Sequence, residues 1–105
     1  MNQSSISLIT ALMLTAASAA GAATSYNTPP AGDKLYPACV KEINESYQGG
    51  NEKSPIRGQS KSQAYCTCLW NETPDEFKGS LAAFAESEKG KGMKKMCEAH
   101  ANWRS

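Results

Sequence analysis

Residues 64–70 read Ala-Tyr-Cys-Thr-Cys-Leu-Trp and contain two of the four cysteines of the chain, Cys66 and Cys68. This stretch is apolar nearly all round, which is typical of a helix buried between others. Two positions apart on a helix correspond to a rotation of about 200°, so the two thiols point to opposite sides. Each thiol therefore needs its own partner, and the remaining cysteines are Cys39 and Cys97. The segment is predicted to be the central helix of a small disulfide-bonded fold.

The N-terminus resembles a secretory signal peptide, which favours disulfide formation. Residues 6–20 form an apolar run of 15 residues, short of the roughly 20 needed to span a bilayer. Small residues follow, and cleavage could occur after Ala19, Ala22 or Ala23. Residues 1–5 contain no Lys or Arg, so a membrane anchor or an Ala-rich tail remains an alternative. We expect residues 1–23 to be removed, leaving no membrane span and a periplasmic or extracellular protein.

The chain after residue 23 has too few large apolar residues to rely on its core alone. It contains eight Leu, Ile, Val and Phe residues together. Small exported domains with such weak cores commonly use disulfides, each contributing about 2 to 4 kcal/mol to stability. All four cysteines are therefore expected to form two bridges.

The pattern of apolar residues and helix breakers predicts a single all-α domain of four short helices in residues 35–105. Residues 24–34, with Pro29, Pro30 and Gly32, are expected to form a flexible lead-in. Thr73-Pro74-Asp75-Glu76 has the form of a helix start with a capping box. The expected helices are 35–48, 60–71, 73–89 and 93–103.

The pairing of the cysteines can be argued from their levels along the first two helices. If these helices form an antiparallel hairpin, Cys68 lies closer to the level of Cys39 than Cys66 does, and a bridge needs Cα atoms within about 7 Å. The favoured pairs are therefore Cys39 with Cys68 and Cys66 with Cys97. The alternative joins Cys39 to Cys66 and Cys68 to Cys97. The two pairings differ in level by less than the usual error in locating helix ends.

No pattern of reactive or metal-binding residues predicts an enzyme. The chain lacks a Cys-x-x-Cys redox motif, and thiolate zinc sites belong to reducing compartments. Met93, Met96 and His100 share a helical face, as copper ligands could, but an ordinary amphipathic helix has the same spacing. His100 is the only histidine, and no nucleophile motif accompanies it. We expect no catalytic residue, no metal and no cofactor.

The remaining signals favour a protein that binds another protein. The net charge is +1, and nothing beyond a local basic turn suggests nucleic-acid binding. Large aromatic side chains are numerous for so small a core, so some should reach the surface. The candidate interaction residues are Trp70, Trp103, Lys91, Lys94 and Lys95. The expected function is that of an inhibitor, an immunity-type protein or an envelope-assembly subunit. The alternative is a carrier of a small apolar ligand, which would need a cavity of about 300 Å³ or more between the helices.

Overall fold

The computed structural model of the protein describes residues 25–103. The predicted signal peptide, residues 1–23, and its cleavage site lie outside the described residues. Within residues 25–103 the structure has four helices, and the only extended pairing is one isolated bridge between Lys53 and Ser60. The predicted all-α fold is therefore confirmed. The helices are α2 (Leu35–Ser46), α3 (Lys61–Glu72), α4 (Leu81–Glu86) and α5 (Lys91–His100). None of the described helices has the length and apolar character needed to cross a membrane.

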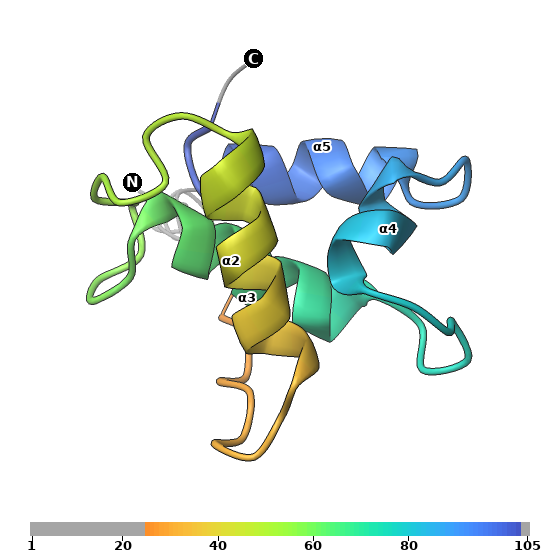
Figure 1. The fold of residues 1–105 in the computed structure, drawn as a ribbon. Helices are drawn as coiled ribbons and strands as arrows, with labels where there is room; N and C mark the ends of the chain where they lie inside the picture. The colour runs from red at the N-terminus through yellow and green to blue at the C-terminus, as the bar shows by residue number, and fades with distance from the viewer. Residues whose placement is uncertain (1–24, 104–105) are drawn as a thin grey trace, which may run out of the picture.

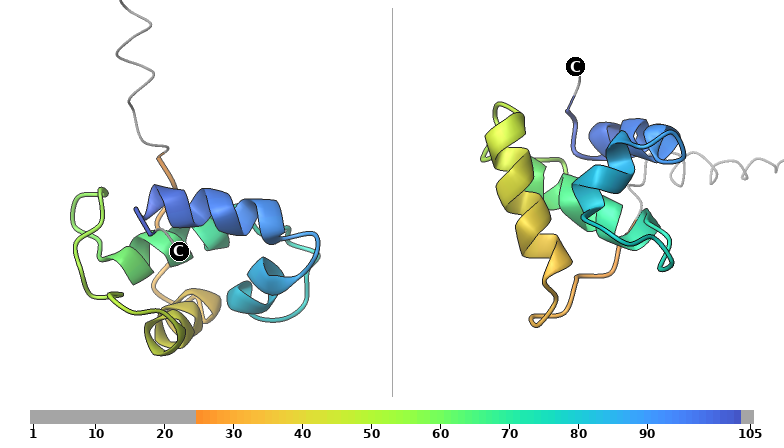
Figure 2. Two further views of the ribbon diagram at one scale, coloured as in Figure 1. Left: turned by 90° about the horizontal axis from the view of Figure 1, so that it is seen from above. Right: turned by 45° about the vertical axis from the view of Figure 1, so that its right-hand side comes forward.

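The central helix is α3, as the sequence predicts. It packs against each of the other three helices, whereas α2 and α5 do not contact one another. Figure 2 (left) shows α3 lying between α5 and α2, with α2 seen nearly end-on. The short α4 contacts both α2 and α5 and closes the remaining side (Figure 1). Every residue from Ala64 to Leu69 is buried, which explains why this segment has no polar face.

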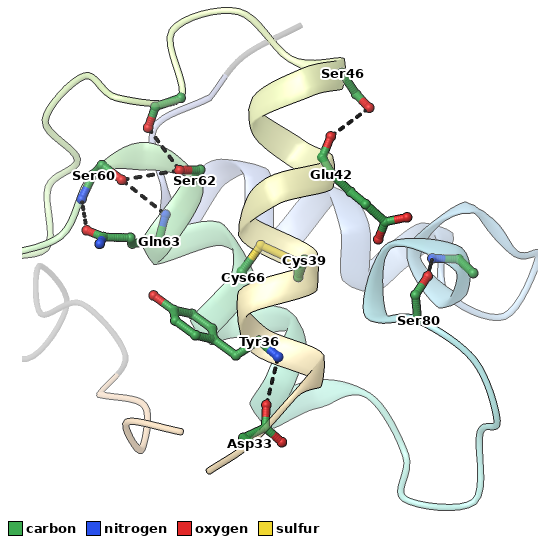
Figure 3. Close-up of a disulfide and its surroundings, with 12 residues drawn as sticks. Asp33, Tyr36, Cys39, Glu42, Ser46, Ser60, Ser62, Gln63, Cys66 and Ser80 are labelled. Carbon is green, nitrogen blue, oxygen red and sulfur yellow. Dashed lines mark hydrogen bonds between the residues drawn. A yellow bond between two sulfur atoms is a disulfide. The ribbon is translucent and has the colours of Figure 1, made fainter. Parts of the chain in front are cut away.

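Two disulfides join α3 to the helices on its two sides. Cys39 of α2 is bonded to Cys66 (Figure 3), and Cys68 is bonded to Cys97 of α5. All four cysteines form bridges, as predicted, but the favoured pairing of Cys39 with Cys68 and Cys66 with Cys97 is wrong.

The error in pairing follows from the way α2 and α3 meet. The predicted pairing assumed two helices lying side by side, so that residues at equal distance from the loop would be level. In the structure α2 crosses α3 steeply (Figure 1). Two crossing helices touch only near one point, and Cys39 and Cys66 each lie close to the middle of their helix. Their Cα atoms are 5.9 Å apart there, within the range that a disulfide requires.

The start of α3 agrees closely with the sequence. Ser60 accepts a hydrogen bond from the backbone N–H of Gln63, and the Gln63 side chain accepts one from the N–H of Ser60, which completes a capping box (Figure 3). These bonds satisfy two of the backbone donors that every helix start leaves without a partner.

The predicted start of the third helix at Thr73 is wrong. Thr73 instead ends α3, because its N–H donates to the carbonyl of Leu69 at 2.9 Å. Pro74 then begins a single turn, closed by the N–H of Phe77 at 3.1 Å. Gly79 has a φ of 132°, a conformation that interrupts any helix. Ser80 supplies the actual cap of α4 by accepting from the N–H of Ala83 at 3.0 Å.

The last helix ends at His100, three residues earlier than predicted, in a Schellman motif. The N–H of Trp103 donates to the carbonyl of Glu98 at 2.7 Å, and that of Asn102 donates to Ala99 at 3.0 Å. Asn102 takes the left-handed conformation that this motif needs, with a φ of 60°. The motif reverses the chain and directs Trp103 back into the core, where its side chain is 8% exposed.

Candidate functional site

Of the two tryptophans, only Trp70 is a candidate for interaction. Trp103 is buried, and its indole N–H donates to the carbonyl of Gln48 at 3.0 Å. Its ring lies 4.6 Å from that of Tyr47 and 5.8 Å from that of Tyr65. The proposal of Trp103 as an interaction residue therefore does not hold, because this side chain packs between the segment that follows α2 and the central helix α3 instead. Trp70, at the end of α3, is only partly buried.

The aromatic cluster around Trp103 is held by polar contacts at its edge. The Tyr47 hydroxyl donates to a Glu98 carboxylate oxygen at 2.7 Å. Burial and this hydrogen bond together raise the pKa of Tyr47 well above its ordinary value. Burial raises the pKa of Tyr65 to about 12. Both phenols therefore keep their protons at neutral pH, and the Tyr47 hydroxyl acts as the hydrogen-bond donor that ties the cluster to α5.

The basic turn at the start of α5 is largely paired with acidic neighbours. Lys91 lies 3.0 Å from Glu88, and Lys94 lies 2.8 Å from Glu86. Lys95 is exposed and has no ion pair within residues 25–103. Alternating charges of this kind do not form a continuous basic patch, so the lysines are weaker interaction candidates than the sequence suggests.

A concave site surrounds Trp70, and we call it the acidic pocket. Its volume is about 410 Å³, and it opens between the lead-in, the beginning of α2 and the connection from α3 to α4. Its apolar lining includes Leu35, Trp70 and Phe77, and two carboxylates, Asp33 and Asp75, also line it. No Lys, Arg or His is part of the lining. The pocket thus combines aromatic faces with negative charge.

Local structure fixes the walls of the acidic pocket. Asp33, one residue before the N-cap of α2, accepts a hydrogen bond from the backbone N–H of Tyr36 in the first turn of that helix at 2.7 Å (Figure 3). The Asn71 side chain accepts a hydrogen bond from the N–H of Asn27 at 3.2 Å and donates one to its carbonyl at 2.9 Å. These bonds attach the first part of the predicted lead-in to α3, and the flexibility of the rest of that segment stays a prediction.

Sequence reasoning missed most of this pocket for one reason. The predicted helix 73–89 places Phe77 within a helix, whereas Phe77 lies in the turn that begins at Pro74 and is only partly buried. Leu35 begins α2, as predicted, but is 44% exposed. The only signal available in the sequence was that Asp33 and Asp75 are the sole aspartates of the chain.

The residues considered for copper have separate surroundings. The Met93 sulfur accepts a hydrogen bond from the Thr73 hydroxyl at 3.8 Å. Met96 is 44% exposed, and His100 packs edge-on against Tyr26 with ring centroids 5.0 Å apart. Within residues 25–103 no group of three or more His, Cys, Asp and Glu side chains is arranged to hold a metal ion.

Comparison of the chain with protein-family models, with curated proteins and with solved structures finds no match. The function must therefore be argued from the chemistry of its own surface.

Proposed function

We propose that this protein is a non-enzymatic binding protein of the periplasm or the extracellular space, and that it holds another protein through the acidic pocket. The observation that carries the proposal is the grouping of Trp70, Phe77 and Leu35 with Asp33 and Asp75 around one concave site. Tryptophan is among the residues that most often dominate binding energy at protein interfaces. An inhibitor, an immunity-type protein or an envelope-assembly subunit would each use such a site.

The lining favours one kind of occupant, a segment of the partner that carries an Arg or Lys beside an apolar side chain. Asp33 and Asp75 attract a cation, and no basic residue of the lining opposes it. An arginine can also stack on an aromatic face while it hydrogen-bonds a carboxylate. Because Asp33 is already held by the backbone of α2, its carboxylate is positioned before the partner arrives. Such preorganisation reduces the entropy lost on binding.

The disulfides support an exported location. Within residues 25–103 all four cysteines are bridged and no free thiol remains. Such bridges persist in oxidising compartments and are rare in the cytosol.

A carrier of a small apolar ligand is the second candidate. The acidic pocket has the volume for a small ligand, at about 410 Å³. However, it lies at the surface between connecting segments, whereas a carrier would enclose its ligand between helices. Two carboxylates in the lining would also repel a fatty acid. These features favour the binding of a cationic protein segment.

The test uses Trp70 as a fluorescent reporter. The chain has only two tryptophans, so Trp103→Phe leaves Trp70 as the sole one. The probes are the capped dipeptides N-acetyl-Phe-Arg-amide and N-acetyl-Phe-Glu-amide. We expect a saturable change in Trp70 emission with the Phe-Arg probe and none with the Phe-Glu probe.

A matched pair of variants assigns the effect to the pocket. Asp75→Asn is expected to weaken the Phe-Arg probe, because it removes a carboxylate of the lining. Glu76→Gln removes the charge of the next residue, which is exposed and outside the lining, and is expected to leave binding unchanged. Equal responses to the two probes, or equal effects of the two variants, would rule out the proposed site. Saturable submicromolar displacement of a fluorescent fatty acid would favour the carrier instead.

A further inference from the structure

A second concave site lies where the lead-in, the loop before α3 and the end of α5 meet, and we call it the basic pocket. Its volume is about 290 Å³. The polar side chains of the lining include Arg57, Gln59, Thr67 and His100, and no Asp or Glu takes part. Tyr26 and Ile56 supply apolar surface. Neither Arg57 nor His100 has a role in the proposed function.

The deepest polar group of the basic pocket is a hydroxyl with an unused proton. Thr67 is 3% exposed, and its oxygen accepts a hydrogen bond from the Gln59 side-chain amide at 3.3 Å. The hydrogen bond from Gln59 uses only an acceptor position of this hydroxyl, so its hydrogen can be donated to an acceptor in the pocket. A ligand that places an acceptor beside this hydroxyl gains a hydrogen bond to a buried donor. The Gln59 amide has a second N–H to offer as well.

The loop that carries Arg57 is held in one conformation before any ligand binds. The Ser54 hydroxyl donates to the carbonyl of Gln59 at 2.8 Å and accepts from the N–H of Ile56 at 3.1 Å. The N–H of Gln59 also donates to the carbonyl of Ile56 at 3.1 Å, which closes the turn. Within residues 25–103 the guanidinium of Arg57 has no carboxylate partner. It is therefore a positive group with five N–H donors available to an anion.

The opposite wall of the basic pocket is formed by α5 and the lead-in. His100 packs against Tyr26, whose hydroxyl donates to Glu72 at 2.9 Å. Although Glu72 is hydrogen-bonded to Tyr26, its carboxylate is not part of the lining of the basic pocket. Burial lowers the pKa of His100, so at neutral pH the imidazole is uncharged and has one N–H to donate.

We propose that the basic pocket binds a carboxylate group attached to a compact apolar body. The carboxylate accepts hydrogen bonds from Arg57 and Thr67, a pairing that suits the planar guanidinium. The apolar body packs against Tyr26 and Ile56. At the roughly 30 Å³ that a water molecule occupies in the liquid, the pocket accommodates about ten non-hydrogen atoms. A free organic acid and the C-terminus of a peptide both offer this chemistry. The proposal does not depend on the acidic pocket.

The test follows the ring protons of His100 by NMR in the oxidised full-length protein. His100 is the only histidine, so its signals need no assignment. The first probe is 3-phenylpropionate, and its control is 3-phenylpropanamide, which has the same body without the charge. We expect a saturable shift with the acid and none with the amide. N-acetyl-valine, which has as many non-hydrogen atoms as 3-phenylpropionate, then stands for a peptide C-terminus, and tighter binding of one acid than the other identifies the source of the carboxylate.

Two variants of the same loop provide the decisive comparison. Arg57→Gln removes the guanidinium, and because Arg57 is exposed the fold should not change. It is expected to weaken binding by about tenfold or more, as for the loss of a charged hydrogen bond. Lys53→Gln removes an equal charge from an exposed residue outside the lining and should leave affinity unchanged. Thr67→Val, which removes the hydroxyl, should also weaken binding. Thr67→Ser, which keeps the hydroxyl, should bind as tightly as the unchanged protein.

Several results would overturn the proposal. They are the absence of a saturable shift at millimolar 3-phenylpropionate, equal binding of the acid and the amide, and equal effects of Arg57→Gln and Lys53→Gln. Binding of inorganic phosphate as tight as that of 3-phenylpropionate would also contradict it, because the apolar body would then contribute nothing. None of these measurements involves the Phe-Arg probe, so this proposal and the proposed function can fail separately.

Discussion

The acidic pocket and the basic pocket both lie against α3, and their linings carry opposite charges. The acidic pocket contains both aspartates of the chain, Asp33 and Asp75, and no basic residue. The basic pocket contains Arg57 and the only histidine, His100, and no acidic residue. The net charge of the chain is only +1, although the linings of the two pockets carry charges of opposite sign. A balanced composition therefore does not exclude charge-selective binding, because the fold separates charges that alternate along the chain.

The two pockets also depend on different disulfides. Asp33 and Leu35 of the acidic pocket lie at the start of α2, which the Cys39–Cys66 bridge joins to α3. His100 of the basic pocket ends α5, which the Cys68–Cys97 bridge joins to α3. Each bridge therefore holds one wall of one pocket in place.

The largest expected effect is that of removing a single bridge. Cys39→Ala with Cys66→Ala, or Cys68→Ala with Cys97→Ala, should lower the free energy of unfolding by about 2 to 5 kcal/mol. Denaturant unfolding measures this loss. Where the variants still fold, the first pair should weaken the Phe-Arg probe more, and the second should weaken 3-phenylpropionate more. Parallel losses of both probes in both variants would show that the pockets are not held separately.

The next largest effect is expected from substitution of the two tryptophans, which should distinguish the structural role of Trp103 from the binding role of Trp70. Trp103→Ala removes a buried aromatic side chain and should cost about 3 to 5 kcal/mol of stability. Trp70→Ala, at a partly buried position, should cost about 1 kcal/mol, yet it should abolish binding of the Phe-Arg probe. Thermal unfolding and calorimetric titration provide the two measurements. A Trp70→Ala protein that binds the Phe-Arg probe normally would remove Trp70 from the acidic pocket's function.

Acid is expected to act on the basic pocket through His100. The change in the free energy of unfolding should be smaller than the change that Trp103→Ala causes. Burial holds the pKa of His100 in the folded protein below its ordinary value of 6.5. The unfolded chain therefore takes up the proton first as the pH falls below 6.5, and stability should decrease there. His100→Gln should remove this part of the pH dependence in unfolding experiments. Bound 3-phenylpropionate should raise the pKa of His100, and an unchanged pKa would place the acid elsewhere.

The smallest effect is expected from the lysines at the start of α5. Lys94→Gln breaks an ion pair with Glu86 at the surface, and such pairs contribute about 0 to 1 kcal/mol. Lys91→Gln should behave in the same way. Neither change should alter binding of the Phe-Arg probe or of 3-phenylpropionate, because neither lysine lines a pocket. A marked loss of binding of either probe would show that the basic turn is an interaction site.

The local signals in the sequence predicted the helices more accurately than the site. The position of α3 and the burial of residues 64–69 were predicted correctly, because they depend on residues close together in the chain. The signature at Thr73 misled because the same residue types also suit a turn after a helix, and the backbone of Thr73 was already bonded to Leu69. The burial of Trp103 depends on the left-handed conformation of Asn102, which no short sequence pattern predicts.

The sequence by itself determined that this chain forms a small all-α domain whose four cysteines are bridged around one central helix. Helical periodicity and the opposite directions of Cys66 and Cys68 are local properties of the backbone, so they required no knowledge of the packing. Only the tertiary structure decided which cysteine meets which and which side chains line each pocket. These outcomes depend on the crossing of α2 over α3 and on the path of the loops, which bring together residues far apart in the chain, such as Asp33 with Asp75 and Arg57 with His100.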